Sequence, residues 1–141
     1  MRAPDRPAPM EFRPLRGVRV TAKPAAIDAV TWPPSAIVVR IAPDDVLVVD
    51  ATPDDAAAVI GLDPYAIVEH ETMFRGAWLD AAQLAALVHK LEWALPSDRP
   101  SLAQGMASGI AIKVVLLEDR TLLIVSGSAL HEVPERLGDV A

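Results

Sequence analysis

The sequence predicts an α+β fold, in which an antiparallel sheet built from hairpins has three helices packed on it. Two observations predict the sheet: apolar, largely β-branched runs flank short acidic turns at 36–50 and again at 110–127. A third predicts the helical layer, because an amphipathic segment at 80–95 follows an extended segment at 66–79. Strands and turns interleaved with single helices along a short chain are typical of this class.

The first strands are predicted from alternation and from turn chemistry. Residues 17–23 alternate well enough for a strand, and a single helical turn at 24–30 follows. In the clearest hairpin the apolar runs 37–41 and 46–49 flank Pro43-Asp44-Asp45. Proline sets the dihedral of the first turn corner and aspartate supports the second. Both runs are nearly continuous in apolar residues, so we expect this hairpin to be central in its sheet.

The first predicted helix has recognisable start and stop signals. Thr52 is a good N-cap, Pro53 suits the first helical position, and Gly61 ends the segment. The three helices of the predicted fold span residues 53–60, 80–95 and 129–137.

The longest helix is predicted to begin after Asp80 as N-cap and to end before Pro96. Its apolar positions recur at helical spacing, which gives one face that packs on the sheet. The following residues 96–109 are rich in Pro, Ser and Gly, so a loop is expected there. Within it, Gly105 and Gly109 have the wrong spacing for a dinucleotide fingerprint and are interpreted as a flexible entry to a strand.

Length and composition indicate a single domain with an arm. At 141 residues the chain can bury roughly two thirds of its unfolded surface. We therefore assign residues 16–141 to one α+β domain. Residues 1–15 are rich in Pro and Arg and lack apolar periodicity, which predicts a flexible arm. An arm that becomes ordered on a partner is the alternative.

The charge and composition exclude several classes of protein. The net charge is −6, and residues 1–23 are basic while the remainder is acidic, which disfavours binding to nucleic acid. Cysteine is absent, so thiolate chemistry is excluded. The sequence shows no signal peptide and no run of the ~18 apolar residues that a membrane span needs, so a cytoplasmic location is the default expectation. The apolar content of 52% reflects either an Ala-rich composition or apolar surface that a partner covers.

No motif predicts a catalytic, cofactor or metal site in this chain. The acidic pairs at 44–45 and 54–55 are explained by turn and cap chemistry. His70 and His131 each neighbour a glutamate but lack metal-ligand spacing. Ser126 and Ser128 lie outside any Gly-x-Ser-x-Gly elbow and are interpreted as a turn into the last helix.

Five residues are candidates for contact with a ligand or a partner. An arginine on a half-buried strand, Arg75, usually pairs with a carboxylate, either inside the protein or on a bound molecule. Tryptophans are core anchors by default and are also frequent interface anchors. A pocket near the N-terminus of the 80–95 helix would suit a carboxylate ligand, and His70, Arg75 and Trp78 are its expected lining. The full set is Arg13, Trp32, His70, Arg75 and Trp78.

Three segments carry a resemblance to a known family. Residues 38–49 have an apolar strand, a Pro-Asp-Asp turn and a second apolar strand. Residues 68–87 have an extended segment followed by a helix of small residues, and 109–132 have a strand, an acidic turn, a strand and a closing helix. This order resembles the gamma subunit of heterotetrameric sarcosine oxidase, which is similar to the N-terminal region of the aminomethyltransferase family. The resemblance covers residues 36–137.

The sequence departs from that family at positions that concern folate. His70 and Asp80 stand where the family typically has Ser and Gly. The Asp and Asn of the folate-binding aminomethyltransferases fall near Ala111 and Ser126 here. The resemblance therefore implies a non-catalytic subunit without folate binding.

The function implied by the resemblance is that of an accessory subunit. It would pack against larger flavin-dependent oxidoreductase chains that oxidise N-methylated amino acids such as sarcosine, and the flavin would reside in those partners. Arg13, Trp32 and Arg75 are the expected interface residues. Two alternatives stay open: a free-standing module that binds a small carboxylate, and a homo-oligomeric structural protein.

Overall fold

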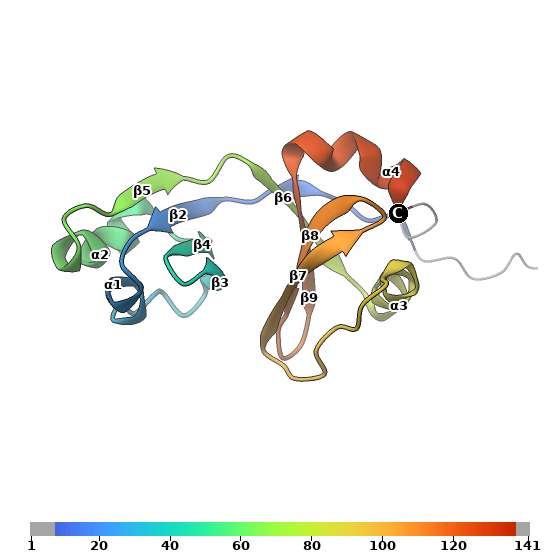
Figure 1. Cartoon of the computed structure of the whole chain (residues 1–141), viewed down its shortest axis with the longest axis horizontal. Helices are drawn as coiled ribbons and strands as arrows, with labels where there is room; N and C mark the ends of the chain where they lie inside the picture. The colour runs from blue at the N-terminus through green and yellow to red at the C-terminus, as the bar shows by residue number, and fades with distance from the viewer. Residues whose placement is uncertain (1–7, 138–141) are drawn as a thin grey trace, which may run out of the picture. The chain divides into compact units, whose positions relative to one another are not determined.

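The computed structural model describes residues 8–137, and its contacts divide the chain into two compact units (Figure 1). Unit 2 is the continuous stretch Leu15–Thr72, and unit 1 combines Met1–Pro14 with Met73–Ala141. Each unit has its own antiparallel sheet with short helices, so the α+β class is confirmed. The expectation of one shared sheet is wrong, because the two predicted hairpins lie in different sheets. The segment 16–141, which the sequence predicts as one domain, therefore spans residues of both units.

The sheet of unit 2 contains the hairpin that the sequence predicts most clearly. Its strand order is β3-β4-β2-β5, with all neighbours antiparallel. The expectation that the whole hairpin is central is wrong, because β4 is internal but β3 is an edge strand. Ala42 pairs with Asp45, so Pro43 and Asp44 form the turn, and a bulge lies between Arg40 and Ala42. The four strands are β2 (Gly17–Thr21), β3 (Ile37–Ala42), β4 (Asp45–Val49) and β5 (Ile67–His70).

Short helices of unit 2 pack on one face of this sheet. Thr52 caps the 3-10 helix η1 (Pro53–Ala56) through a complete capping box with Asp55. Helix α2 (Ala57–Leu62) continues from η1 and includes Gly61, so the helix does not end at that glycine. The core beneath them gathers residues from β2, β4 and the helices, including α1 (Pro24–Asp28): Val18, Val20, Ala26, Ile27, Val46, Val48, Ala56 and Val59.

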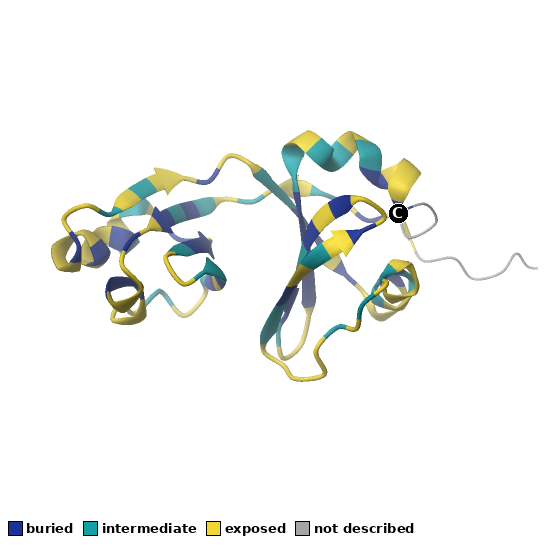
Figure 2. Ribbon diagram, in the orientation of Figure 1, coloured by how far each residue is buried: buried dark blue, intermediate teal, exposed yellow. Residues whose placement is uncertain are grey.

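The sheet of unit 1 has the strand order β1-β6-β9-β8-β7. The predicted hairpin 110–127 is confirmed as β8 and β9, and residues 121–125 of β9 are all buried (Figure 2). The five strands are β1 (Arg13–Pro14), β6 (Phe74–Leu79), β7 (Ser101–Ala107), β8 (Ile110–Leu116) and β9 (Thr121–Ser126).

Strand β7 lies in the segment predicted as a loop, and this expectation is wrong. It pairs with β8 along its whole length. Ser108 and Gly109 both have positive φ, 49° and 84°, as a two-residue hairpin turn of the type I′ class requires. The turn residues are visible in the sequence, but the strand depends on distant pairing with β8 and on the packing of Trp93 over Gly105.

Helix α3 (Ala81–Lys90) is shorter than the predicted 80–95. Asp80 and Gln83 form the expected capping box at its start. The helix ends because Leu91 is extended, with φ −87° and ψ 138°, five residues before Pro96. Beyond that point Trp93 donates its indole N–H to the carbonyl of Met106 at 2.7 Å, so a tertiary contact sets the helix end. The predicted last helix, 129–137, is the 3-10 helix η2 (Gly127–Glu132) followed by α4 (Val133–Arg136).

The described part of the predicted arm packs on unit 1. Met10 is buried in the core with Leu87 and Val133, and the Gln83 side-chain amide donates to the carbonyl of Ala8 at 2.8 Å. Strand β1 pairs with β6. Residues 8–14 are therefore part of the fold, because the buried side chain of Met10 and the hydrogen bond from Gln83 hold them on unit 1. Residues 1–7 of the predicted arm lie outside the described residues. Between residues 8 and 137 no helix is long and apolar enough to cross a membrane.

Candidate functional site

The predicted pocket residues belong to different strands and different units. His70 ends β5 in unit 2, whereas Arg75 and Trp78 lie on β6 in unit 1. Arg75 and Trp78 are three residues apart on one strand, so their side chains point to opposite faces of the sheet. Of the other two candidates, Arg13 is exposed on β1 beside Glu11, and Trp32 packs half-buried against the core of unit 2.

Arg75 supports the corner at which β9 turns into η2. Its guanidinium lies against Gly127, where an added Cβ would be only 3.3 Å from Cζ. The Nη1 group donates to the carbonyl of Phe74 at 3.2 Å. Gly127 in turn donates its N–H to the carbonyl of Met73 at 2.7 Å. These contacts place Arg75 in the packing of the β6–η2 corner.

Trp78 is a partly solvent-exposed tryptophan with a cationic neighbour. It is 45% exposed, and the guanidinium carbon of Arg120 lies 4.1 Å from the ring centroid. A cation over an indole ring is attracted by the negative face of the ring. The default interpretation of Trp78 as a core anchor is therefore wrong, because nearly half of the residue is exposed.

A small cavity lies near the N-terminus of α3, where the sequence predicts a carboxylate site. Its volume is about 220 Å³, and Asp80, Arg99 and Arg120 are among its lining residues. Arg99 donates to the carbonyls of Leu117 and Arg120 and to the hydroxyl of Thr121. The Asp80 carboxylate accepts from the backbone of α3, so it occupies the place that an anionic ligand would take at a helix start.

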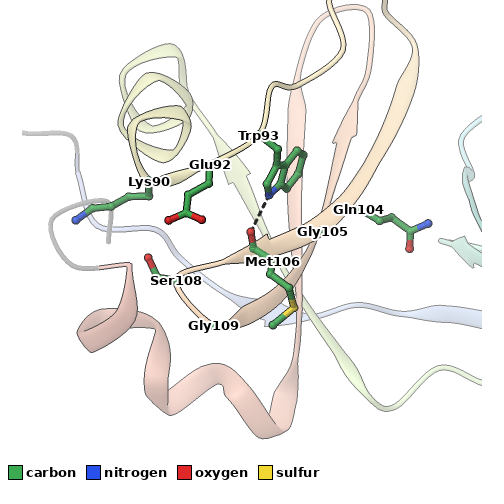
Figure 3. Close-up of a pocket in the computed structure, with 8 residues that line it drawn as sticks. All are labelled: Lys90, Glu92, Trp93, Gln104, Gly105, Met106, Ser108 and Gly109. Atoms are coloured by element: carbon green, nitrogen blue, oxygen red, sulfur yellow. Dashed lines mark hydrogen bonds between the residues drawn. The ribbon is translucent and has the colours of Figure 1, made fainter.

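A larger open cavity of about 500 Å³ lies between the end of α3 and β7 (Figure 3). Trp93 forms one wall, and its indole N–H is bound to the carbonyl of Met106. Sequence reasoning missed this cavity, because nothing local to Trp93 indicates a partner on a strand more than ten residues away. The lining residues are Lys90, Glu92, Trp93, Gln104, Gly105, Met106, Ser108 and Gly109.

Ion pairs in unit 2 connect strands. Arg19 binds Asp45 through two bonds of 2.7 Å, and the buried carboxylate of Glu71 lies 3.9 Å from the same guanidinium. The hydrogen bond to Asp45 is the main cause that raises the pKa of Arg19, and burial opposes it. The cluster joins β2, β4 and the residue that follows β5, and it sets one guanidinium against two carboxylates.

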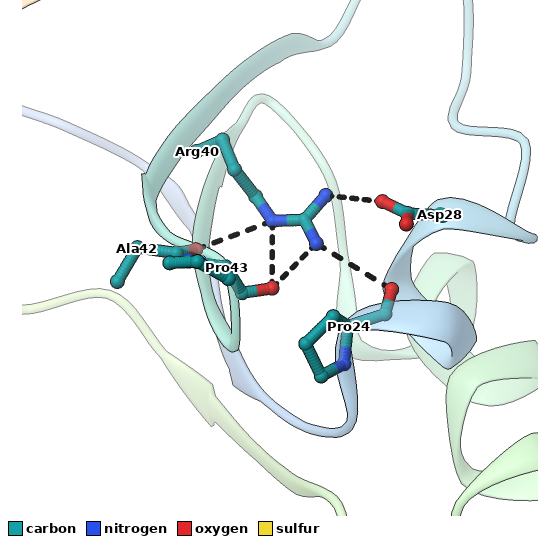
Figure 4. Close-up of polar contacts among 5 residues, drawn as sticks. All are labelled: Pro24, Asp28, Arg40, Ala42 and Pro43. Atoms are coloured by element: carbon teal, nitrogen blue, oxygen red, sulfur yellow. Dashed lines mark hydrogen bonds and ion pairs between the residues drawn. The ribbon is translucent and has the colours of Figure 1, made fainter.

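Arg40 ties the β3–β4 turn to α1 (Figure 4). It donates to the carbonyls of Ala42, Pro43 and Pro24 and to the carboxylate of Asp28, the last at 2.7 Å. A guanidinium that is shared among one turn and one helix has a structural role.

Buried polar side chains in the described part of the chain are engaged in structural contacts. Across residues 8–137 every buried side-chain nitrogen or oxygen has a hydrogen-bond partner. The same residues contain no group of three His, Asp or Glu side chains placed to hold a metal ion. Ser126 and Ser128 are 2.8 Å apart through their hydroxyl oxygens, and Ser126 caps η2 as expected of a turn.

Exposed apolar side chains gather in unit 2 where α2 leads into β5. We call Leu62, Tyr65 and Ile67 the edge patch; they are 56%, 88% and 55% exposed. Asp63 shapes the connection, because its carboxylate accepts from the backbone amides of Lys23 and Tyr65 at 2.9 and 3.0 Å. The Lys23 amide is the main cause that lowers the pKa of Asp63 below its usual value. Sequence reasoning missed this patch, although three large apolar residues within six positions indicate it.

Comparison with known proteins identifies a shared fold. No family model matches the sequence, and no curated protein matches it either. Among solved structures, a chain of the heterotetrameric sarcosine oxidase from Corynebacterium sp. U-96, determined in complex with pyrrole 2-carboxylate, is similar with a TM-score of 0.65. The two sequences are 14% identical, and the match covers 96% of this chain and 86% of the other. The likeness extends over both units and concerns the fold.

Proposed function

We propose that this chain is a non-catalytic accessory subunit of an oxidoreductase complex that acts on N-methylated amino acids such as sarcosine. The observation that carries the proposal is the structural match to a chain of a heterotetrameric sarcosine oxidase over nearly the whole length of both chains. A match of that extent includes both units, so it supports a common role for the complete fold.

The local chemistry of the described residues supports a role in assembly. The arginines Arg19, Arg40 and Arg99 bind carboxylates and carbonyls of their own unit. Large apolar side chains are exposed instead, among them Trp78 and the edge patch. Exposed aromatic and apolar side chains are typical of protein interfaces. In this proposal the oxidation takes place on the partner chains, which hold the flavin.

The experiment that tests the proposal is purification of the tagged full-length chain from its source organism under gentle conditions. We expect larger chains to co-elute in fixed stoichiometry, with the yellow absorbance of bound flavin. Mass spectrometry of the eluted chains and sarcosine-dependent reduction of the flavin then identify the complex. A colourless protein that elutes alone under these conditions contradicts the proposal.

The second candidate function, a free-standing carboxylate-binding module, has the cavity beside α3 in its favour. Against it, Asp80 already caps that helix and Arg99 is bound to the backbone. A binding module gains thermal stability with its ligand. A rise in melting temperature with sarcosine or pyrrole 2-carboxylate, abolished by Arg120→Ala, would favour this candidate over the accessory subunit.

A further inference from the structure

Strand β5 is an edge strand with one open side. Among residues 8–137 it pairs with β2 alone, and the N–H of Glu71 donates to the carbonyl of Gly17 at 2.9 Å. In an antiparallel ladder, hydrogen-bonded residues alternate with residues whose main-chain groups point away from the partner. The register therefore directs the main-chain N–H and C=O of Val68 and His70 away from β2, toward the open side.

The other edge strands of the described sheets are protected. Strand β1 has only two residues, one of them Pro14. The carbonyl of Met106, which points outward from β7, accepts the indole N–H of Trp93. Strand β3 has a bulge beside Arg40, whose side chain crosses the turn. Short length, covering side chains, bulges and charge are the devices by which proteins block pairing at sheet edges.

Strand β5 is also short, with four residues, and carries the exposed Glu69. Unlike β1 and β3, however, it contains no proline and its ladder with β2 has no bulge, and apolar side chains extend from it. Ile67 begins the strand, and Leu62 and Tyr65 immediately precede it in the edge patch. An edge with open main-chain groups and exposed apolar side chains favours the addition of a further strand.

The charge of unit 2 indicates the composition of such a strand. Residues 15–72 include four Lys or Arg and nine Asp or Glu, whereas the rest of the chain includes nine and ten. Nearly all of the net negative charge therefore lies in unit 2. Glu69 is exposed on β5 itself, and Arg19, which faces it across the ladder, binds Asp45. A strand that brings Lys or Arg side chains complements this surface.

We propose that an extended segment of a partner subunit, carrying apolar and Lys or Arg side chains, adds to the sheet of unit 2 along β5. This inference rests on the proposed function, since the partner belongs to the same complex. Val68 and His70 supply the main-chain hydrogen bonds, the edge patch receives the apolar side chains, and Glu69 faces the cations.

Two variants and one matched control test the proposal in the full-length chain. His70→Pro removes an outward N–H and leaves the β2 ladder intact, as proline at an edge position allows. Ile67→Lys places a cation on the edge patch. Val38→Lys is the control, because Val38 is 46% exposed on β3, the opposite edge strand of the same sheet. Each test variant should weaken association with the purified partner chains about tenfold, while the control leaves it unchanged.

A second measurement uses a short synthetic peptide of alternating valine and lysine, with a glutamate counterpart as control. Titration of the full-length protein should shift the amide resonances of Val68 and His70 with the lysine peptide only. If the complex forms and both variants bind normally, the β5 inference is wrong and the proposed function stands. If no complex forms, the proposed function fails, and the peptide shifts alone decide about β5. Absence of these shifts, or dimerisation of the chain through Ile67, overturns the inference.

Discussion

Gly17 lies at the start of β2, and a methyl group at this position would collide with the backbone of the neighbouring strand. A Cβ added at Gly17 would lie 2.2 Å from the carbonyl oxygen of Val48 and 3.0 Å from the Cα of Val49. Both are main-chain atoms of β4, so no side-chain rotation relieves the overlap. We therefore predict that Gly17→Ala displaces the end of β2 and destabilises unit 2.

The size of the effect follows from the contacts around this residue. Overpacking that shifts the backbone costs about 1–3 kcal/mol. Displacement also weakens two hydrogen bonds, from Glu71 to the Gly17 carbonyl and from Asp50 to the Arg16 carbonyl, at about 1 kcal/mol each. Alanine also lowers the entropy of the unfolded chain, which stabilises the folded protein by about 0.4–1 kcal/mol. The free energy of unfolding should fall by about 2–4 kcal/mol, a large share of the usual 5–15 kcal/mol.

The measurement is urea-induced unfolding followed by circular dichroism, with amide exchange to locate the change in unit 2. Gly61→Ala in α2 is the matched control, because a Cβ there meets nothing within 4 Å. That change should raise the free energy of unfolding by about 0.4–1 kcal/mol. If Gly17→Ala unfolds within about 0.5 kcal/mol of the wild type, the close approach of β2 and β4 is refuted.

Three further predictions concern single side chains. Leu87→Ala opens a cavity in the core of unit 1, because Leu87 is fully buried, and should lower the free energy of unfolding by about 2–5 kcal/mol in thermal melts. Its control is Val88→Ala, at a 45% exposed position, which should change the free energy of unfolding by less than about 0.5 kcal/mol. Asp80→Ala removes the cap of α3 and should cost about 0.5–2 kcal/mol, and an unchanged melting temperature would contradict the capping box. Asp63→Asn should destabilise the protein at pH 7, because the lowered pKa of Asp63 means that its carboxylate form stabilises the fold. That contribution begins to fall below about pH 4, near the pKa of an unfolded aspartate, and is lost as pH falls through the lowered pKa. The melting temperatures of variant and wild type should therefore approach each other as the pH is lowered below that point.

Local signals in the sequence predict those parts of the fold that depend on neighbouring residues. The turn at Pro43 and Asp44 and the caps at Thr52 and Asp80 form as expected, since each involves contacts within a few positions. The period of two along β6 also places Arg75 and Trp78 on opposite faces, and this argues from the sequence alone against a shared pocket.

Other parts of the fold depend on contacts between distant residues. The extended segment 66–79 shows no proline or glycine at 71–73, yet β5 joins one sheet and β6 the other. Burial of Met10 and the indole contact of Trp93 with Met106 likewise require the tertiary fold. The candidate surface along β5 became recognisable only when the strand order showed it to be an edge.

The discontinuity of unit 1 has a consequence for the order of folding. Strands β1 and β6 pair although all of unit 2 separates them in the chain. Once unit 2 has formed, the bond between Glu71 and Gly17 already holds its two ends together. This bond shortens the effective loop between β1 and β6 about tenfold. The entropic cost of closing that loop falls by roughly 2 kcal/mol. Unit 2 is also synthesised before β6. Its formation therefore brings β1 and β6 close together before they pair. In pulse-labelled refolding its amides should gain protection first, and simultaneous protection of both units would contradict this order.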